Sequence, residues 1–202
     1  MTQSFPWDRA DQSVGCVQSG YSGIVAAVGL RPDIWLRAMQ SFRQHRLNPL
    51  ITDANTVTIV DFRLNTTETR LWVIDTRTKD VLVQARVSHG HNSGTSRGPG
   101  ETFANLDQSN KSSIGAFVTL TTGHRSLGGI TNGLVMFIRG LDPTNSRASS
   151  RGIMFHGAVY MAGNRSGRSH GCFATDPSVN KNLIDLTKGG SFVFAYGGDV
   201  CR

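Results

Sequence analysis

The sequence predicts a mostly-β fold of the α+β class, with one or two helices packed on the strands. Glycine makes up 23 of the 202 residues, and Thr, Ser and Asn are frequent throughout, which indicates many turns and therefore many short strands. Residues 81–87 alternate apolar and polar side chains with the period of a half-buried strand. Apolar residues recur at helical spacing in two segments, which begin at Pro32 and Pro177.

The predicted elements follow one another along the chain. Pro32-Asp33 is typical of a first helical turn, and Asn48-Pro49 ends this helix. We therefore expect residues 1–49 to form a small helical N-terminal extension and residues 50–202 to form the main domain. A second helix is predicted from Pro177 to Lys188. Strands are predicted at residues 57–62, 71–74, 81–87, 115–120, 134–139, 152–156 and 191–196, with long loops at 89–113 and 157–171 that are typical of functional segments.

The composition narrows the classes of function. Charged residues make up only 17% of the chain, which argues against a disordered protein or a coiled coil. The net charge is +7 and arises from 17 arginines against 4 lysines. Such a surface attracts polyanions such as an acidic cell-wall polymer. The arginines are scattered singly, so no nucleic-acid partner is predicted. No apolar run approaches the roughly 20 residues of a membrane span.

Three cysteines leave two interpretations open. Cys16 and Cys201 lie near the two ends of the chain, and Cys172 lies in a glycine-rich segment. A Cys16–Cys201 disulfide would leave Cys172 free and would place the protein in an oxidising compartment. The alternative is three reduced thiols. Residues 1–12 carry no signal-peptide pattern, so either export follows another route or a leader precedes this numbering.

The segment from Gly167 to Ala174 is the strongest candidate for chemistry. It contains Ser169-His170-Gly171-Cys172, in which small neighbours can leave the thiol accessible and Gly171 permits the close backbone approach of an oxyanion hole. A thiolate is a nucleophile that an adjacent imidazole can activate. His156, at the end of a predicted strand, is a better-fixed base than the loop residue His170. The alternative for Cys172 is a small buried apolar side chain.

A second group of polar residues follows the strand at 81–87. His89-Gly90-His91 resembles half of a zinc site, but a third ligand is not evident, so a hydrogen-bonded anchor or an active-site wall is also considered for His89. Asn92, Ser93, Asn105 and Ser113 could line a peptide pocket or bind the backbone of their own loops. No glycine-rich segment follows a strand and opens a helix, so no nucleotide is predicted.

An ordered series of motifs extends over residues 56–196. It runs through Ile59-Val60-Asp61-Phe62, Glu68 to Asp75, Ser88-His89-Gly90, Phe103-Ala104-Asn105, Ser112 to Gly115, Arg151 to Ala158, and Gly167 to Ala174. This series resembles the L,D-transpeptidases with a YkuD-type catalytic domain, and most of all their murein L,D-transpeptidase branch. The chain departs from the branch at Phe173, where Pro is usual, and at His170, where an aromatic residue is common.

The resemblance implies a role for each site residue. It implies a catalytic domain of β-sandwich or barrel-like form, in which Cys172 is the nucleophile, His156 is the general base and the Gly157 carbonyl orients the base. Gly171, Cys172 and His170 would form the oxyanion hole. Candidate substrate-binding residues are His89, Asn92, Ser93, Asn105, Ser113, Arg168 and Ser169. No cofactor or metal is implied.

The resemblance also implies a reaction and a location. Cys172 would attack a peptidoglycan stem tetrapeptide, release D-alanine and pass the acyl group to a neighbouring stem as a 3→3 cross-link. A periplasmic or otherwise extracytoplasmic monomer that carbapenems acylate is expected. Three alternatives stay open: an L,D-carboxypeptidase or endopeptidase on the same scaffold, a zinc hydrolase using His89 and His91, and a wall-binding module without catalysis.

Overall fold

One mixed β-sheet forms the centre of the computed structural model, which describes residues 27–127 and 130–198. Within those ranges the sheet has eight strands in the order β3-β2-β1-β8-β4-β5-β6-β7, of which the β1–β8 and β6–β7 pairs are parallel. The strands are β1 Asp53–Asp61, β2 Leu71–Asp75, β3 Val81–Ala85, β4 Gly115–Leu127, β5 Ile130–Gly140, β6 Met154–Gly157, β7 Phe173–Thr175 and β8 Ser191–Tyr196. The mostly-β prediction is confirmed. Cys16 and Cys201, the proposed disulfide pair, lie outside the described residues.

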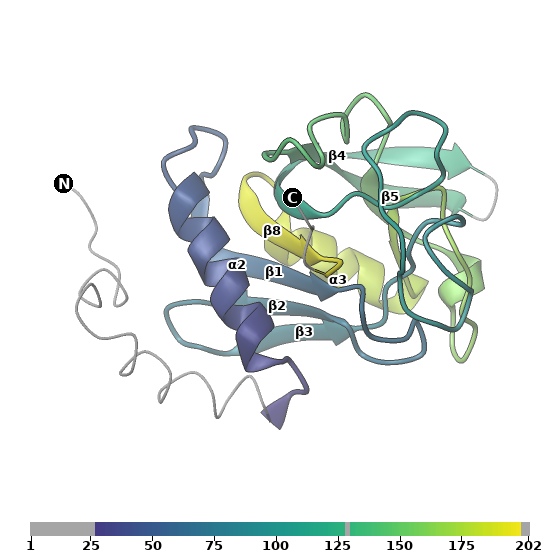
Figure 1. Cartoon of the computed structure of the whole chain (residues 1–202), viewed down its shortest axis with the longest axis horizontal. Helices are drawn as coiled ribbons and strands as arrows, with labels where there is room; N and C mark the ends of the chain where they lie inside the picture. The colour runs from purple at the N-terminus through teal and green to yellow at the C-terminus, as the bar shows by residue number, and fades with distance from the viewer. Residues whose placement is uncertain (1–26, 128–129, 199–202) are drawn as a thin grey trace.

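The two edges of the sheet meet, as the barrel-like prediction requires. The segment that follows β3 forms a bridge from Val87 to Thr175 in β7, and the Ser88 amide donates to the Ala174 carbonyl at 2.7 Å. A second bridge joins Gly90 to Ser169. The segment 87–90 therefore runs beside the chain that carries Cys172, and the curled sheet can be followed in Figure 1.

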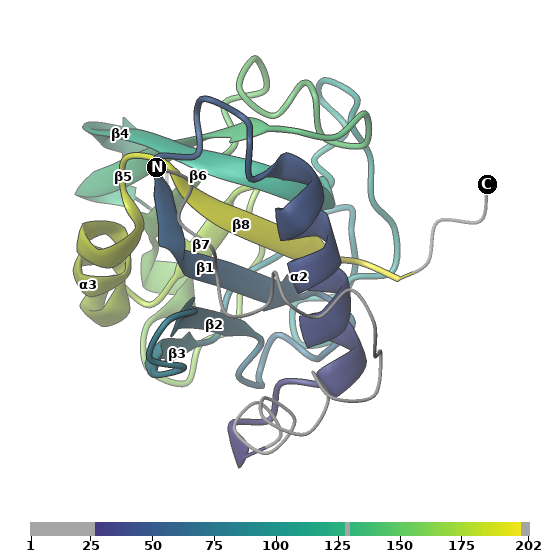
Figure 2. The same cartoon turned by 90° about the vertical axis from the view of Figure 1, so that its left-hand side faces the viewer.

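The two helices cover different parts of the sheet, on opposite sides in Figure 2. α3 (Pro177–Thr187) begins at Asp176, whose side chain accepts a hydrogen bond from the Ser178 amide as an N-cap. Its Leu183 and Ile184 are buried with residues of β6, β7 and β8. α2 (Pro32–His45) packs against the other face through Ile34, Trp35, Ala38 and Phe42, which share a cluster with β1 and β2.

α2 is thus part of the folded core. Its four apolar residues are at most 4% exposed, because they cover strand residues that would otherwise face water. The boundary at residue 49 between an extension and the main domain stays a prediction. No helix in the described part of the chain is long and apolar enough to cross a membrane.

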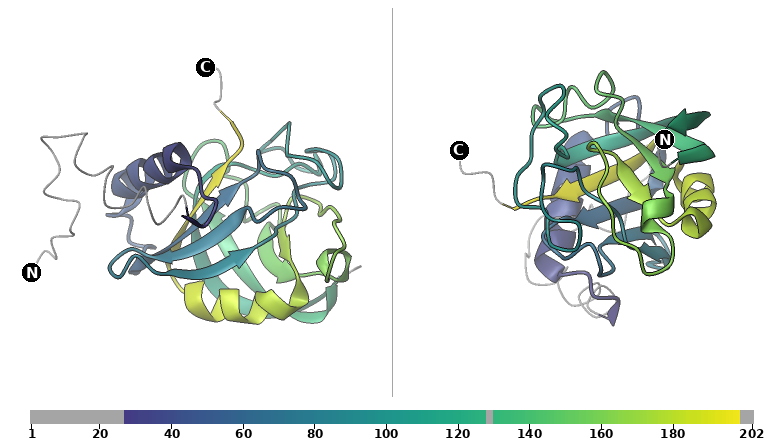
Figure 3. Two further views of the ribbon diagram at one scale, coloured as in Figure 1. Left: turned by 90° about the horizontal axis from the view of Figure 1, so that it is seen from below. Right: turned by 90° about the vertical axis from the view of Figure 1, so that its right-hand side faces the viewer.

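Two differences from the predicted elements have physical reasons. β4 and β5 extend to Leu127 and from Ile130, beyond the predicted 115–120 and 134–139, because the backbone pairing continues through polar residues such as Thr122 and Arg125 that lack apolar alternation. β7 is absent from the predicted strands because it has only three residues, at the end of a glycine-rich loop. The long loops gather at one end of the sheet, away from α2 (Figures 1 and 3).

Candidate active site

Cys172 lies directly before β7, after a turn that requires glycine. Gly171 has a φ of +119°, and a Cβ there would lie 2.8 Å from the Lys111 carbonyl oxygen and 2.9 Å from Ile153 Cδ1. The Cys172 side chain is half-buried, and its thiol donates to the Gly152 carbonyl with an Sγ–O distance of 3.6 Å. The tight turn thus places the Cys172 thiol in contact with the segment that leads into β6.

The register of the parallel β6–β7 pair brings His156 into the neighbourhood of Cys172. Phe155 is paired with Phe173 and His156 with Ala174, so Cys172 is displaced by two residues from the partner of His156. Two residues of rise and one strand spacing separate their Cα atoms by about 8 Å, a distance that an imidazole and a thiol can close.

The His156 ring is held by the next residue in the strand. Its Nδ1 lies 3.1 Å from the Gly157 carbonyl oxygen. Because a carbonyl only accepts, Nδ1 carries the proton and donates it. Nε2 is then the nitrogen with the free lone pair, which is the form needed to accept a proton from a thiol.

Burial keeps both groups neutral. Burial lowers the pKa of His156, and the hydrogen bond to Gly157 only partly opposes this effect. Burial also raises the pKa of the Cys172 thiol, opposed by the Met154 amide and by the charge of Arg151. At pH 7 the pair is therefore a neutral imidazole beside a thiol, which suits general-base activation rather than a preformed ion pair.

Arg151 is a residue of this site that the sequence reasoning did not single out. Its guanidinium donates four hydrogen bonds, at 2.6–3.2 Å, to the Ala104 and Lys111 carbonyls and to the Ser109 and Ser113 hydroxyls. A Cβ on Gly171 would lie only 3.4 Å from its Nη2. Arg151 therefore joins the 104–113 loop to the Cys172 turn and places a positive charge near the thiol.

Tyr160 is a second residue found only in the structure. It lies on a 3₁₀ turn (Val159–Met161) soon after His156, and a Cβ on Gly167 would meet its ring at 2.6 Å. Burial and the nearby Cys172 raise the pKa of the Tyr160 phenol, whereas its hydrogen bond to Ser88 lowers it. The Tyr160 phenol is therefore neutral at pH 7. A tyrosine four residues beyond a strand-end histidine carries no recognisable sequence signal.

Two observations bear on the predicted oxyanion hole, which stays a proposal. The Gly171 amide already donates to Ser169 Oγ at 3.1 Å, so this N–H is not free to bind an oxyanion in this conformation. His170 is exposed and lines a cavity of about 340 Å³ together with Asp107, Gln108, Asn110, Ser150 and Arg151. The contribution of the Cys172 amide stays a prediction.

Most of the predicted substrate-binding residues bind their own loops in this structure, and their contact with substrate stays a prediction. His89, Ser93, Ser113 and Ser169 are at most 3% exposed. Their side chains are used internally: Ser93 Oγ accepts from the Ser112 amide, and Ser169 Oγ donates to the Cys172 carbonyl at 2.7 Å. Asn92, Asn105 and Arg168 are less buried, but each donates to loop carbonyls, including those of Ser109, Pro143 and His91 respectively.

The environment of His89 also argues against a zinc site. His89 is fully buried and His91 is exposed, so the two rings do not share one site. Nη2 of the buried Arg70 donates to His89 Nδ1 at 3.0 Å. Burial and this guanidinium lower the pKa of His89 to about 4. A cation at the ring disfavours a second cation there, and the described residues contain no cluster of three metal-ligating side chains.

Comparison with known proteins adds the family context. The model of the family described as the L,D-transpeptidase catalytic domain matches residues 27–196. A similar solved structure is the helical cell shape determining protein Pgp2 from Campylobacter jejuni, at 9% identity and a TM-score of 0.50 over 73% of this chain and 49% of that chain. An L,D-transpeptidase from Mycobacterium smegmatis has 14% identity and a TM-score of 0.44 over 70% of this chain and 58% of that one.

The likeness to the Campylobacter jejuni structure concerns the fold alone. The chain spans about half the length of the first of these structures. A search of curated proteins found no significant match.

Proposed function

The chain belongs to the L,D-transpeptidase catalytic-domain family, and from this premise we propose that it is a cysteine L,D-transpeptidase of peptidoglycan. One observation carries the assignment of residues: His156 pairs with Ala174 of β7, two residues after Cys172, and Nδ1 of His156 is held by the Gly157 carbonyl. A nucleophile, a base and a group that orients the base are the three parts of a thiol acyl-transferase.

The first half-reaction forms an acyl-enzyme. His156 Nε2 takes the thiol proton as Cys172 Sγ attacks the carbonyl carbon of the bond before D-alanine in a stem tetrapeptide. The C–N bond breaks, His156 returns the proton to the leaving amine, and D-alanine departs. A thioester on Cys172 remains.

The second half-reaction transfers the acyl group. The amine of a neighbouring stem attacks the thioester, His156 accepts the proton from that amine, and the Cys172 thiolate leaves and is reprotonated. The product is a 3→3 cross-link. Water as the acceptor gives a shortened stem and a hydrolytic enzyme. The proposed enzyme acts as a monomer in the extracytoplasmic space, where its substrate lies, and needs no cofactor.

Intact-mass spectrometry with a carbapenem tests the nucleophile. We expect one adduct on the wild-type chain and none on Cys172→Ala. His156→Gln should slow adduct formation by about 100-fold or more, as loss of a general base does, whereas the matched variant His170→Gln should not. An adduct on Cys172→Ala, or equal effects of the two histidine variants, contradicts the assignment.

Incubation with muropeptides tests the reaction. Cross-linked dimers together with free D-alanine indicate transfer, and free D-alanine alone indicates the carboxypeptidase alternative. Activity that a chelator abolishes and that survives in Cys172→Ala would instead favour the zinc hydrolase. Binding to sacculi without turnover by the wild-type chain would favour the wall-binding module.

A further inference from the structure

A groove lies between α2, the end of β8 and the loop that follows β5. Its volume is about 700 Å³. α2 contributes Arg37, Gln40, Ser41 and Gln44 to the lining, and the last three residues of β8 contribute another part of it. Figure 2 shows α2 crossing the end of β8. Neither member of the proposed catalytic pair lines the groove, so it is a separate feature of the fold.

One wall of the groove is a polar stripe of α2. Its members, which we call the α2 stripe, are Arg37, Gln40, Ser41 and Gln44. Their spacing of i, i+3, i+4 and i+7 places them on one face of the helix. Three of them are exposed and Ser41 is partly exposed, so their polar groups are open to solvent. The helical rise separates Arg37 from Gln44 by about 10 Å, which is about the length of two linked hexose rings.

The charges in the lining cancel. Arg37 and Asp142 are the only charged residues in the described lining, although the chain carries a net charge of +7. Both carboxylate oxygens of Asp142 are already engaged, because Oδ1 lies 2.9 Å from His45 Nε2 and Oδ2 accepts from the Ala116 amide at 2.6 Å. The Arg37 guanidinium lies 5.6 Å from the centre of the Tyr196 ring, a cation–π contact that orients it. The groove therefore offers a ligand mainly amide and hydroxyl groups.

The wall opposite α2 is tied to the loop beside Cys172. Ile114, Pro143 and Thr144 line the groove. Thr144 Oγ1 donates to the Ile114 carbonyl at 2.8 Å, and Asn105 Nδ2 donates to the Pro143 carbonyl at 2.9 Å. Asn105 belongs to the loop that packs against the Cys172 turn. A ligand in the groove thus lies against a wall that is hydrogen-bonded to the loop bordering the thiol, and a polymer can contact both places.

We propose that this groove binds the glycan strand of peptidoglycan, a chain of linked N-acetylated sugars. The hydroxyl and acetamido groups hydrogen-bond to the α2 stripe, and a sugar ring contacts Phe194, which is partly exposed in the lining. A stem peptide fits less well, because its carboxylates would find Arg37 as the one cation of the lining and would lie near Asp142. The choice of glycan rests on the proposed function, since the stems that Cys172 attacks are attached to such strands.

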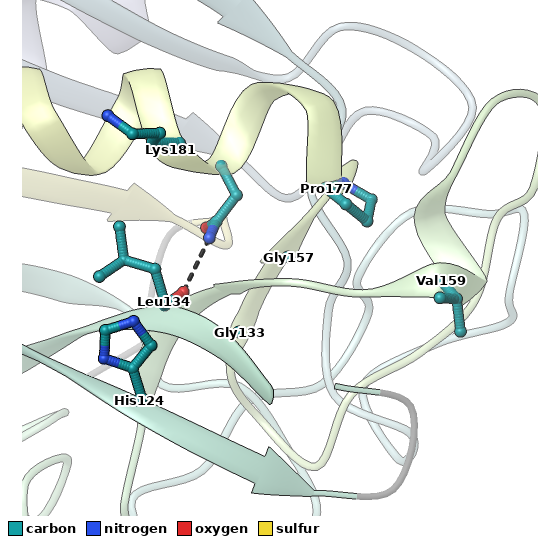
Figure 4. A pocket seen from close by; sticks show the side chains of 8 residues that line it. His124, Gly133, Leu134, Gly157, Val159, Pro177 and Lys181 are labelled. Carbon is teal, nitrogen blue, oxygen red and sulfur yellow. Dashed lines mark hydrogen bonds between the residues drawn. The ribbon is translucent and has the colours of Figure 1, made fainter. Parts of the chain in front are cut away.

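Methyl NMR of the wild-type chain with a linear tetramer of N-acetylglucosamine tests the groove, because this probe carries no stem and is not turned over. We expect saturable shifts of the Ile114 and Thr144 methyl signals, with a dissociation constant on the order of 1 mM for a ligand bound mainly by polar contacts. The Leu134 and Val159 methyl signals serve as the reference and should not shift. Both residues line a separate cavity between α3 and β5, which Figure 4 shows.

A double variant and a second sugar make the result specific. Gln40→Ala with Gln44→Ala keeps the helix, because alanine has the higher helix propensity, and removes both amides. This variant should bind the tetramer about fivefold more weakly or worse, as loss of two hydrogen bonds does. Gln84→Ala is the matched control, because Gln84 is exposed on β3 and does not line the groove. A tetramer of glucose, which lacks the acetamido groups, should bind about threefold more weakly.

The proposal is overturned if the Ile114 and Thr144 signals do not shift, or if the reference signals shift with them. It is also overturned if the double variant and Gln84→Ala bind alike, if the two tetramers bind equally, or if an unlinked stem tetrapeptide shifts these signals at a lower concentration than the glycan does. None of these outcomes depends on Cys172. Failure of this proposal and failure of the carbapenem experiment are therefore separate results.

Discussion

Replacing Gly157 by alanine tests whether the packing behind β6 sets the orientation of His156. The added methyl would lie 3.0 Å from Pro177 Cα and 3.2 Å from Asn180 Cβ. Neither atom belongs to a flexible side-chain end, since one is backbone and the other is fixed to it. The clash can therefore be relieved only if β6 and the first turn of α3 move apart.

The expected cost follows from these contacts. Overpacking a filled site costs about 1–3 kcal/mol, which for a chain of this size lowers Tm by roughly 3–10 °C. The movement also shifts the Gly157 carbonyl, which lies 3.1 Å from His156 Nδ1. A displacement of about 1 Å at a catalytic group can slow a reaction by about 100-fold, and relief of these contacts needs only a few tenths of an ångström. We therefore expect carbapenem acylation of Cys172 to slow by about 3- to 10-fold.

The assay compares two alanine variants of similar stability. Gly189 has a φ of +83°, and a methyl group added there would meet no atom within 4 Å. Gly189→Ala therefore loses stability through backbone strain alone, at about 1 kcal/mol, and far from His156. Acylation is followed by mass spectrometry well below both melting temperatures. Equal acylation rates in the two variants would refute the link between Gly157 and the base, and an unchanged Tm for Gly157→Ala would refute the packing argument.

Three further predictions use the charges around the site. Burial lowers the pKa of His156 below the ordinary histidine pKa near 6.5, so this base is still neutral at pH 6.5. The acylation rate should therefore change little between pH 7.5 and about 6.5 and fall only at lower pH. A stopped-flow pH profile checks this expectation. The pKa of His89 is about 4 in the folded state and near 6.5 in the unfolded state. As the pH falls, the unfolded state therefore binds the proton at a higher pH than the folded state does. The free energy of unfolding should decrease by roughly 2–3 kcal/mol between pH 6.5 and pH 4. Urea titrations should show that His89→Asn, which still offers Arg70 an acceptor, lacks this slope. Arg151→Met removes the charge that lowers the pKa of Cys172 and the hydrogen bonds to the 104–113 loop. Thiol alkylation at pH 7 should therefore slow, and proteolysis in the loop should increase. Arg77→Met, which loses an exposed ion pair with Asp75 outside this loop, should change neither.

Patterns carried by neighbouring residues predict much of the fold. The alternation at 81–87 and the proline starts at Pro32 and Pro177 correspond to β3, α2 and α3. The added length of β4 has no such pattern, because Thr121, Thr122, His124 and Arg125 are exposed polar residues in succession. Three residues of β7 are too few to show a period, and the strand exists because β6 and the segment after β3 supply partners on both sides.

Side chains that share a local motif are easier to identify than those brought together by folding. Cys172 lies in a recognisable sequence context, and His156 lies at a strand end. Arg151 and Tyr160 come near the thiol only because the 104–113 loop and a 3₁₀ turn fold over it. Conversely, the serines and His89 resemble substrate contacts in the sequence. A polar residue in a long loop can equally be there to form a hydrogen bond with a buried backbone group, and the sequence does not distinguish these two roles.

The excess of arginine over lysine has a structural explanation as well as an electrostatic one. Arg70 is fully buried and donates to the Val87 and Leu64 carbonyls as well as to His89. Arg86 donates to three carbonyls between residues 161 and 165, and Arg151 binds four groups of the 104–113 loop. A planar guanidinium with five donors can bind several acceptors at once, which a lysine ammonium does less well. Part of the net charge of +7 is therefore used to fix the loops around Cys172, and the basic surface available to an acidic polymer is smaller than the composition alone suggests.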